Sequence, residues 1–513
     1  MFAAIALTAC ATTPTTPASL LADLKPGTHL TGTPAALTNR LVLNAEDFVY
    51  DAKLSPDGRT AALSRLGMKS FHLAIHDVAN PPVRRADPAI NTLEFDIDTL
   101  EFSPDGAHVA TVSRDGALRL FSTAGVLEAA WLTEEPLVSV AWHPGGQLLA
   151  LGSARGLVTL VSFPQLQHVA ELRAHADEVR ALAFTPGGEL VSGSWDKRLL
   201  VFTIADGKSV TNEVRTHVEK KNGQVLFRAV LDRAASATVA LDVRAPMLVV
   251  KSPLAQAAGI EALTLTETTQ IQNQFGTQVA KVARKRTLAI KNLVFTDIDV
   301  AICDACVPPD AQAVLGGPML QQVNVAFDDS AKEIVFTVTG TGVSVGSSKT
   351  LSLARAFTFP ASVNDLSLDA KGTTAGVAFS ETKSERTKAV YDREKKGEIE
   401  PEREWDCGAR VDVATGQVIE KLTGHRGVVA TAGISPDGRT LATGGWDKKV
   451  LVHAGQKLSA GKFGWAVRRV RFSADGTKLV VAAWTPQNPL GDHQSDPAGV
   501  VFEVVYREAS VER

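Results

Sequence analysis

Long apolar runs, an excess of one charge and cysteine are all scarce in this chain. No run of 18 or more apolar residues occurs among its 513 residues, which excludes a membrane-spanning helix in this sequence. The net charge is only −3, with both signs spread along the chain, so the basic face typical of nucleic-acid-binding proteins is missing. The chain has four cysteines, and its one close pair, Cys303 and Cys306, has no second Cys or His pair nearby in sequence. We therefore expect no metal site and no cofactor.

What is present is the composition of a globular protein. Apolar residues make up 45% of the chain and charged residues 21%. A length of 513 residues exceeds what one ordinary core fills, so we expect more than one folding unit.

The first ten residues read MFAAIALTAC, and Leu7-Thr8-Ala9-Cys10 resembles the lipobox of bacterial lipoproteins. The resemblance implies that residues 1–10 are the remnant of a signal peptide and that Cys10 is acylated. Residues 11–36 begin Ala/Thr/Pro-rich and are expected to form a flexible tether. The resemblance therefore also implies that a lipid anchors the protein in the bacterial cell envelope, at the outer membrane, where it faces the periplasm or the cell surface. The alternative is an ordinary disordered tail.

A turn signature recurs seven times, each time after an apolar strand. The turns begin at Ser55, Ser103, His143, Thr185, Asp369, Ser435 and Ser473, as in Ser55-Pro56-Asp57-Gly58. Proline presets φ at the second turn position, and glycine accepts the positive φ at the last. Short β-rich runs with a period near 40 residues indicate an all-β propeller.

Two segments, 174–203 and 424–453, resemble WD40 repeats closely, and the other five repeats match by turn and strand pattern only. The family joins a His, a hydroxyl and an Asp in a hydrogen-bond network that stabilises each blade. The matching residues are His175, Ser192 and Asp196 in the first segment, and His425, Thr443 and Asp447 in the second. The same residue types could form a hydrolase triad, but no nucleophile elbow or oxyanion loop accompanies them.

Seven turns predict a seven-bladed WD40-like β-propeller, with a small domain inserted between blades 4 and 5. The expected limits are 37–218 for the closing strand and blades 1–4, 219–344 for the insert and 345–508 for blades 5–7. The closing strand is expected near 37–45, where it would complete the last blade and remove a free sheet edge.

The insert resembles the retropepsin-like aspartic proteases over nearly its whole length. The matching segments are Leu241–Pro246 at the catalytic strand, Leu254–Gly259 after it, and Val314–Gly317 with Leu320 at the second motif. The resemblance implies that Asp242 occupies the catalytic position, and that two copies of the domain would have to meet for catalysis.

The sequence departs from the family at the two residues after Asp242. Val243 replaces the hydroxyl residue, and Arg244 replaces the glycine that lets the loop pass behind the carboxylates. A guanidinium turned toward Asp242 would favour the ionised carboxylate over the proton-sharing pair that catalysis needs. We therefore expect an inactive retropepsin-like domain; the alternative is an aspartic endopeptidase acting as a dimer through Asp242.

Cys303-Asp304-Ala305-Cys306 is a C-x-x-C motif with three interpretations. We favour a local disulfide in an oxidising compartment over half of a zinc site or a thioredoxin-type redox motif. The whole sequence predicts a cell-envelope scaffold that binds unidentified proteins or peptides, attaches to a membrane through its lipid and binds no nucleic acid.

Overall fold

In the computed structural model, the structure describes residues 28–44, 48–66, 71–79, 81–90, 97–133, 135–206, 213–232, 235–273, 276–291, 293–340, 343–345, 349–380, 407–453, 457–463, 466–484 and 499–512. The chain divides into two compact units: residues 1–61, 76–84 and 365–513 form the first, and residues 62–75 and 85–364 the second. Within the described ranges, no helix has the length and apolar content to cross a bilayer.

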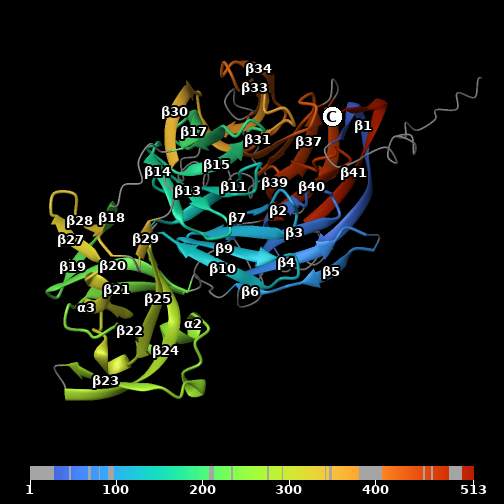
Figure 1. Ribbon diagram of the computed structural model, residues 1–513. Coiled ribbons are helices and arrows are strands. Elements are labelled where there is room, and N and C mark those ends of the chain that lie inside the picture. The colour runs from blue at the N-terminus through green and yellow to red at the C-terminus, as the bar shows by residue number, and fades with distance from the viewer. Residues whose placement is uncertain are drawn as a thin grey trace, which may run out of the picture. The chain divides into compact units, whose positions relative to one another are not determined.

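Seven sheets of four or five strands contain the predicted turns (Figure 1). The first three, in strand order, are β2 (Phe48–Leu54), β3 (Thr60–Leu66), β4 (Phe71–Asp77) and β5 (Val83–Ala86), with β6 (Ala89–Ile90) beside β4; β10 (Leu127–Leu132), β9 (Ala117–Ser122), β8 (His108–Ser113) and β7 (Ile97–Phe102); and β11 (Leu137–Trp142), β12 (Leu148–Ser153), β13 (Leu157–Ser162) and β14 (His168–Arg173).

The other four are β15 (Val179–Phe184), β16 (Leu190–Ser194), β17 (Arg198–Asp206) and β30 (Lys349–Thr358); β31 (Ser362–Leu368), β32 (Thr374–Ser380), β33 (Cys407–Asp412) and β34 (Val418–Leu422); β35 (Val429–Ile434), β36 (Leu441–Gly445), β37 (Lys449–His453) and β38 (Lys457–Lys462); and β1 (His29–Asn44), β41 (Gly499–Glu512), β40 (Lys478–Trp484) and β39 (Ala466–Phe472).

The turn signature works through a repeated set of hydrogen bonds. In the turn between β2 and β3, the Ser55 hydroxyl donates to Asp57 Oδ1 at 2.5 Å, and the Gly58 amide donates to the Ser55 carbonyl at 2.8 Å. Gly58 has φ of 65°, a conformation that a side chain disfavours. Ser103, Ser435 and Ser473 make the same side-chain bond to the Asp two residues later, so each signature closes a hairpin.

The strand β1 pairs antiparallel with β41, which joins the two ends of the chain (Figure 1). Leu30 opposes Val511 and is fully buried, and the strand predicted at 37–45 lies mostly within β1. The predicted tether, 11–36, is therefore wrong from His29 onward, because this stretch buries apolar side chains and pairs along its backbone. Residues 1–27, which include Cys10, lie outside the described residues.

The inserted segment interrupts a sheet instead of following it. β17 pairs with β30, from Arg198 opposite Thr358 to Asp206 opposite Lys349, so the insertion separates the third and fourth strands of one sheet. The prediction that the insertion lies between blades 4 and 5 and starts at 219 is therefore wrong. The insertion lies within one sheet and follows β17, which ends at Asp206. The physical reason is that β30 has mostly exposed side chains and is defined by its long-range backbone pairing.

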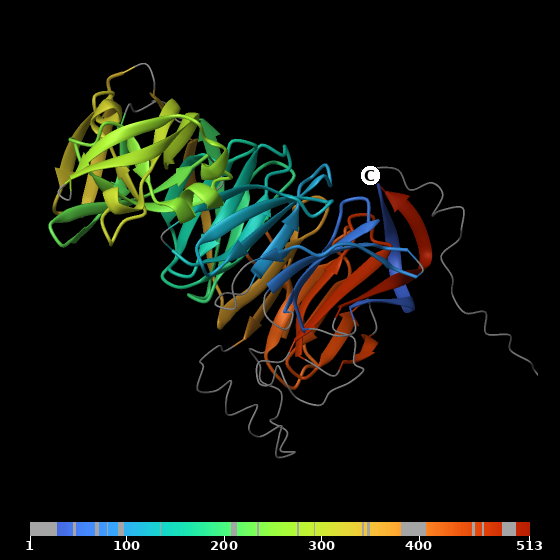
Figure 2. The same ribbon diagram turned by 90° about the horizontal axis from the view of Figure 1, so that it is seen from below.

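Two sheets and short helices make up the insert, whose strands gather together in green to yellow in Figure 2. The smaller sheet has the order β18 (Glu213–His217), β28 (Glu333–Val338) and β27 (Val323–Asp328). The larger sheet has the order β19 (Glu219–Lys221), β20 (Gln224–Leu231), β21 (Ala235–Leu241), β26 (Ala313–Leu315), β22 (Leu248–Val250), β25 (Leu293–Ile302), β24 (Gly276–Ile290) and β23 (Thr268–Asn273), with β29 (Val343–Val345) beside β25.

The helices of the insert are α2 (Ser252–Ala257), α3 (Gly317–Leu320) and the 3₁₀ turns η1 (Ala262–Thr264) and η2 (Asp304–Cys306). A core of its own stabilises this segment. Phe227 and Phe336 are buried with their ring centroids 5.6 Å apart, in an edge-to-face arrangement that aromatic pairs prefer.

Candidate functional site

A cleft of about 770 Å³ opens in the insert beside Asp242. Its walls come from the start of β20, the end of β21, the segment after Cys306 and the strand β27. β20 and β21 pair from Leu231 opposite Ala235 to Leu226 opposite Ala240, and the residues at this end of the pair line the cleft. The cleft thus lies at the residues that the sequence singled out as a former catalytic loop.

The loop after β21 is held by the second predicted motif. β21 runs parallel to β26, with Leu241 opposite Leu315, and the Asp242 amide donates to the Leu315 carbonyl at 3.2 Å. Gly316 follows directly: a β-carbon there would lie 2.3 Å from the Met247 carbonyl oxygen, closer than atoms can approach. The two motifs, far apart in sequence, are therefore in contact, and Gly316 permits the close approach.

Asp242 and Arg244 form a bidentate ion pair at the cleft. Arg244 Nε lies 3.0 Å from Asp242 Oδ1, and Nη2 lies 3.1 Å from Oδ2. The Arg244 amide also donates to Oδ1 at 3.0 Å. The hydrogen bonds from the guanidinium, which outweigh the effect of burial, hold the pKa of the Asp242 carboxyl below its usual range. The ionised Asp242 carboxylate is thus paired with the Arg244 guanidinium.

Each chain supplies one carboxylate to the cleft, so the two carboxylates that acid proteolysis needs would have to come from two copies of the domain. Asp242 is the sole acidic residue among the described residues that line it. No cluster of three or more potential metal ligands occurs in the described ranges. The feature of this cleft that opposes a shared proton is the ion pair between Arg244 and Asp242.

One wall of the cleft is a sheet edge. β27 pairs with β28 on one side, and no strand in the described part of the chain pairs with its other side. Phe327 on this strand exposes 48% of its surface, and Val243 across the cleft exposes 73%. A free edge beside exposed apolar side chains is the arrangement on which an extended peptide adds as a further strand.

Another part of the cleft lining is next to a disulfide between Cys303 and Cys306, whose Cα atoms lie 5.3 Å apart. Cys306 faces the cleft, while Cys303 is buried. Cys407, on β33, is buried.

The structure brings each predicted His, hydroxyl and Asp together. His175 Nδ1 lies 3.0 Å from Asp196 Oδ2, and its Nε2 lies 2.7 Å from Ser192 Oγ. Phe202 occupies the position where the family has a Trp, and it is fully buried. Both His175 and Ser192 are buried, so a substrate could not reach the hydroxyl. The trio is suited to joining strands and not to nucleophilic attack.

The second trio repeats this geometry. His425 Nδ1 lies 2.8 Å from Asp447 Oδ1, and its Nε2 lies 2.9 Å from Thr443 Oγ1. Burial alone would raise the pKa of the Asp447 carboxyl, but the bond with His425 and its charge lower the pKa below the usual range. Asp196 shows the same direction for the same reasons.

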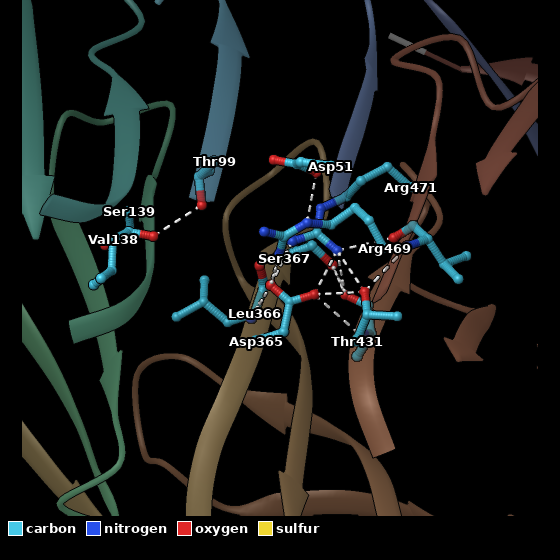
Figure 3. Close-up of polar contacts among 12 residues, drawn as sticks. Asp51, Thr99, Val138, Ser139, Asp365, Leu366, Ser367, Thr431, Arg469 and Arg471 are labelled. Atoms are coloured by element: carbon cyan, nitrogen blue, oxygen red, sulfur yellow. Dashed lines mark hydrogen bonds and ion pairs between the residues drawn. The ribbon is translucent and has the colours of Figure 1, made fainter. Parts of the chain in front are cut away.

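Sequence reasoning missed a buried charge network in the first unit (Figure 3). Arg469 Nη1 donates to Asp365 Oδ1 at 2.7 Å, and its Nε donates to Asp51 Oδ1 at 2.7 Å. Arg471 donates to both oxygens of Asp365, at 2.8 and 2.6 Å, and the Thr431 hydroxyl donates to Oδ2 at 2.6 Å. Burial opposes ionisation of Asp365, but the two arginines outweigh it and hold its pKa below the usual range.

A signal for this network exists in the sequence. One polar position recurs four residues before the start of each turn signature, except that the fourth repeat has Ala181; its occupants are Asp51, Thr99, Ser139, Asp365, Thr431 and Arg469. Thr99 and Ser139 use it to donate to backbone carbonyls of the next sheet, at 2.9 and 2.5 Å. Aligning the repeats on their turns would have identified a polar position that joins neighbouring sheets.

Comparison with known proteins identifies WD40 repeats in this chain. The family model for the WD domain, G-beta repeat, matches residues 89–122, 166–203 and 416–453. The prediction of WD40 repeats within a propeller-like all-β fold is therefore confirmed for these segments.

Two individual proteins are similar to this one. A WD repeat-containing protein SL1-17 of Schistosoma mansoni is 34% identical over 115 residues, which cover 22% of this chain and 38% of that protein. The chain thus matches well under half of this relative's length. A chain in the crystal structure of a mitotic checkpoint complex aligns over 99% of both chains, with a TM-score of 0.47 and 10% identity.

Proposed function

We propose that this protein is a protein-interaction platform, in which seven WD40-like blades form a ring and a retropepsin-like insert adds a peptide-binding cleft. WD40 repeats mostly serve to bind other proteins, and three family matches support this role for the chain. Seven sheets of four or five strands, with β1 and β41 joining the chain ends, support the seven-bladed ring.

The retropepsin-like origin of the insert is supported by the contacts of its two motifs. The parallel pairing of β21 with β26 and the tight approach of Gly316 to the loop after Asp242 are those that the resemblance requires. α2 begins at Ser252, two residues before the second matching segment, and covers its first four residues, Leu254 to Ala257. The domain would then retain its substrate cleft after losing its chemistry.

The observation that carries the proposal for the insert is the cleft with β27 along its wall. Backbone groups of β27 would bind an extended peptide as an added strand, while Phe327 and Val243 would contact its apolar side chains. The Arg244–Asp242 ion pair leaves no shared proton for attack on the peptide bond, so the peptide is bound and released intact. We place this platform at the bacterial cell envelope, tethered through acylated Cys10.

A library of random 12-residue peptides tests the binding role on the full chain. Peptides enriched on the native protein should be lost on Phe327→Asp, which places a charge at the cleft, and should be retained on Val279→Asp. Val279→Asp is the matched control, because Val279 is exposed on the same insert and does not line the cleft. If no peptide is enriched, or if both variants behave alike, the cleft is not the binding surface.

A further inference from the structure

Residues 303–310 contribute to the cleft lining, and contacts hold this segment, called the wall below, at both of its ends. At one end, η2 is closed by the Cys303–Cys306 disulfide, and Cys306 and Pro308 line the cleft. At the other end, the Asp310 carboxylate accepts a hydrogen bond from the Asn222 side-chain amide at 2.6 Å and forms an ion pair with Lys221 at 2.9 Å. These contacts join the wall to the turn before β20, which also borders the cleft.

Further bonds connect this wall to the segment that starts α2. The Ser252 amide donates to Asp304 Oδ1 at 2.5 Å, and Lys251 Nζ donates to the Pro308 carbonyl at 3.0 Å. Asp304 lies between the two cysteines, so the disulfide holds the carboxylate in the position that Ser252 requires. The disulfide-closed segment is therefore joined by polar contacts to the residues at the start of α2.

We propose that the Cys303–Cys306 disulfide is a redox-sensitive clasp: its reduction releases the 303–310 wall and weakens the binding of extended peptides in the cleft. This inference names the regulation of the binding site and rests on the proposed function for its consequence. In the step, two thiols of an external dithiol transfer two electrons and two protons to the disulfide. Two cysteine thiols form on the protein, and the reductant leaves as its own disulfide.

Reduction is a local event because the disulfide closes a ring between residues only three apart in sequence. Loop-closure entropy grows with ring size, so a ring this small contributes little to the stability of the whole domain. The main core of the insert, which contains Phe227, Phe295 and Phe336, includes neither cysteine, whereas Cys303 belongs to a smaller buried cluster with Val307 and Ala311. The domain thus remains folded while the wall loosens, and a wall that must be ordered on binding lowers peptide affinity.

Cys407 provides an internal control for this chemistry. It is buried in β33, so a thiol reagent should reach it only after unfolding. Cys306 faces the cleft and should be reached directly. With Cys10→Ser in every protein, reduction of a folded chain should expose the Cys306 thiol directly and the buried Cys303 thiol through release of the wall. A third reactive thiol would report loss of the fold.

The test follows amide hydrogen exchange in the full chain before and after reduction. We expect exchange in residues 303–312 and at Ser252 to accelerate by up to about 20-fold, the limit set by losing so small a ring. Exchange in residues 227–231 of β20, where Phe227, Ala229 and Leu231 belong to the main core, should stay unchanged. The double variant Cys303→Ser/Cys306→Ser should match the reduced protein, and if it fails to fold, the reduced native chain still gives the answer. Equal exchange in the two redox states overturns the clasp.

Peptide binding separates this inference from the proposed function. The tightest peptide recovered from the library should bind the oxidised chain about 10-fold more tightly than the reduced chain, because the released wall must be reordered. Equal affinities would refute the regulatory role even if the wall exchanges faster. A library that yields no peptide would refute the binding role of the cleft, while hydrogen exchange would still decide whether the clasp exists.

Discussion

Asp365 and Asp242 are both bound by arginine, and their surroundings give the two ion pairs opposite roles. Asp365 exposes 1% of its side chain and is enclosed by Arg469, Arg471 and Thr431. Asp242 exposes 36% of its side chain, and its partner Arg244 exposes 87%. A buried charge cannot be left without its partner, whereas an exposed charge can exchange its partner for water. Burial therefore makes the first pair structural and leaves the second to determine what the cleft can do.

The largest expected difference between the two sites is in stability. Asp365→Asn should lower the free energy of unfolding by about 3–5 kcal/mol, because it leaves buried arginines without full compensation. Asp242→Asn should change the free energy of unfolding by less than about 1 kcal/mol. Urea denaturation of the two variants checks this pair of values, and similar midpoints would show that burial does not distinguish them.

The pH dependence of stability should follow the buried carboxylates. The folded-state pKa values of Asp365, Asp196 and Asp447 lie below the unfolded value, so their contribution is complete above that value and is lost as the pH falls through the folded pKa. The native chain should therefore lose stability below about pH 4. Asp365→Asn should reduce the slope there by about 1.4 kcal/mol per pH unit, as measured by urea midpoints between pH 2.5 and 6.

The close approach behind the Asp242 loop can be broken without touching a charge. Gly316→Ala should destabilise the insert by about 1–3 kcal/mol, because its β-carbon would meet the Met247 and Ala245 carbonyl oxygens. Gly187→Ala is the control, since the nearest atom to a β-carbon there is 3.8 Å away. Thermal unfolding of both variants measures the effect, and an unchanged melting temperature for Gly316→Ala would contradict the contact between the two motifs.

The smallest expected change in stability concerns the exposed pair itself. Arg244→Met should raise the pKa of Asp242 toward its ordinary value near 3.9 with little effect on stability, because the Arg244 side chain is exposed. NMR titration of the Asp242 carboxyl gives the pKa. Arg284→Met removes another paired arginine of the insert, which binds Glu267 and Asp299, and should leave the Asp242 titration unchanged.

The repeats could be predicted from sequence because their signal is local. The Ser-Pro-Asp-Gly turns specify their own hydrogen bonds, and the segments 174–203 and 424–453 carry the residues that the family model matches. The departure at Arg244 was also visible, since one residue replaced the glycine, and its ion pair with Asp242 follows from opposite charges two residues apart.

Long-range pairing escaped prediction because it leaves little local trace. β30 has few buried side chains, so nothing in its sequence showed that it completes the sheet of β17 across the insertion. The start of β1 was concealed in the same way within a supposed tether. The Asp365 network was detectable, because Asp365, Thr431 and Arg469 occupy the same position of three repeats, four residues before each turn signature.

The central claim is that the cleft beside the Asp242–Arg244 ion pair binds peptides without cleaving them. Cleavage of an unfolded protein such as casein, at acid and neutral pH, tests it. The native chain and Asp242→Asn should give the same background, with no fragments that depend on the carboxylate. Fragments produced by the native chain and abolished in Asp242→Asn would show that the ion pair with Arg244 opens for catalysis, and the platform role of the insert would be contradicted.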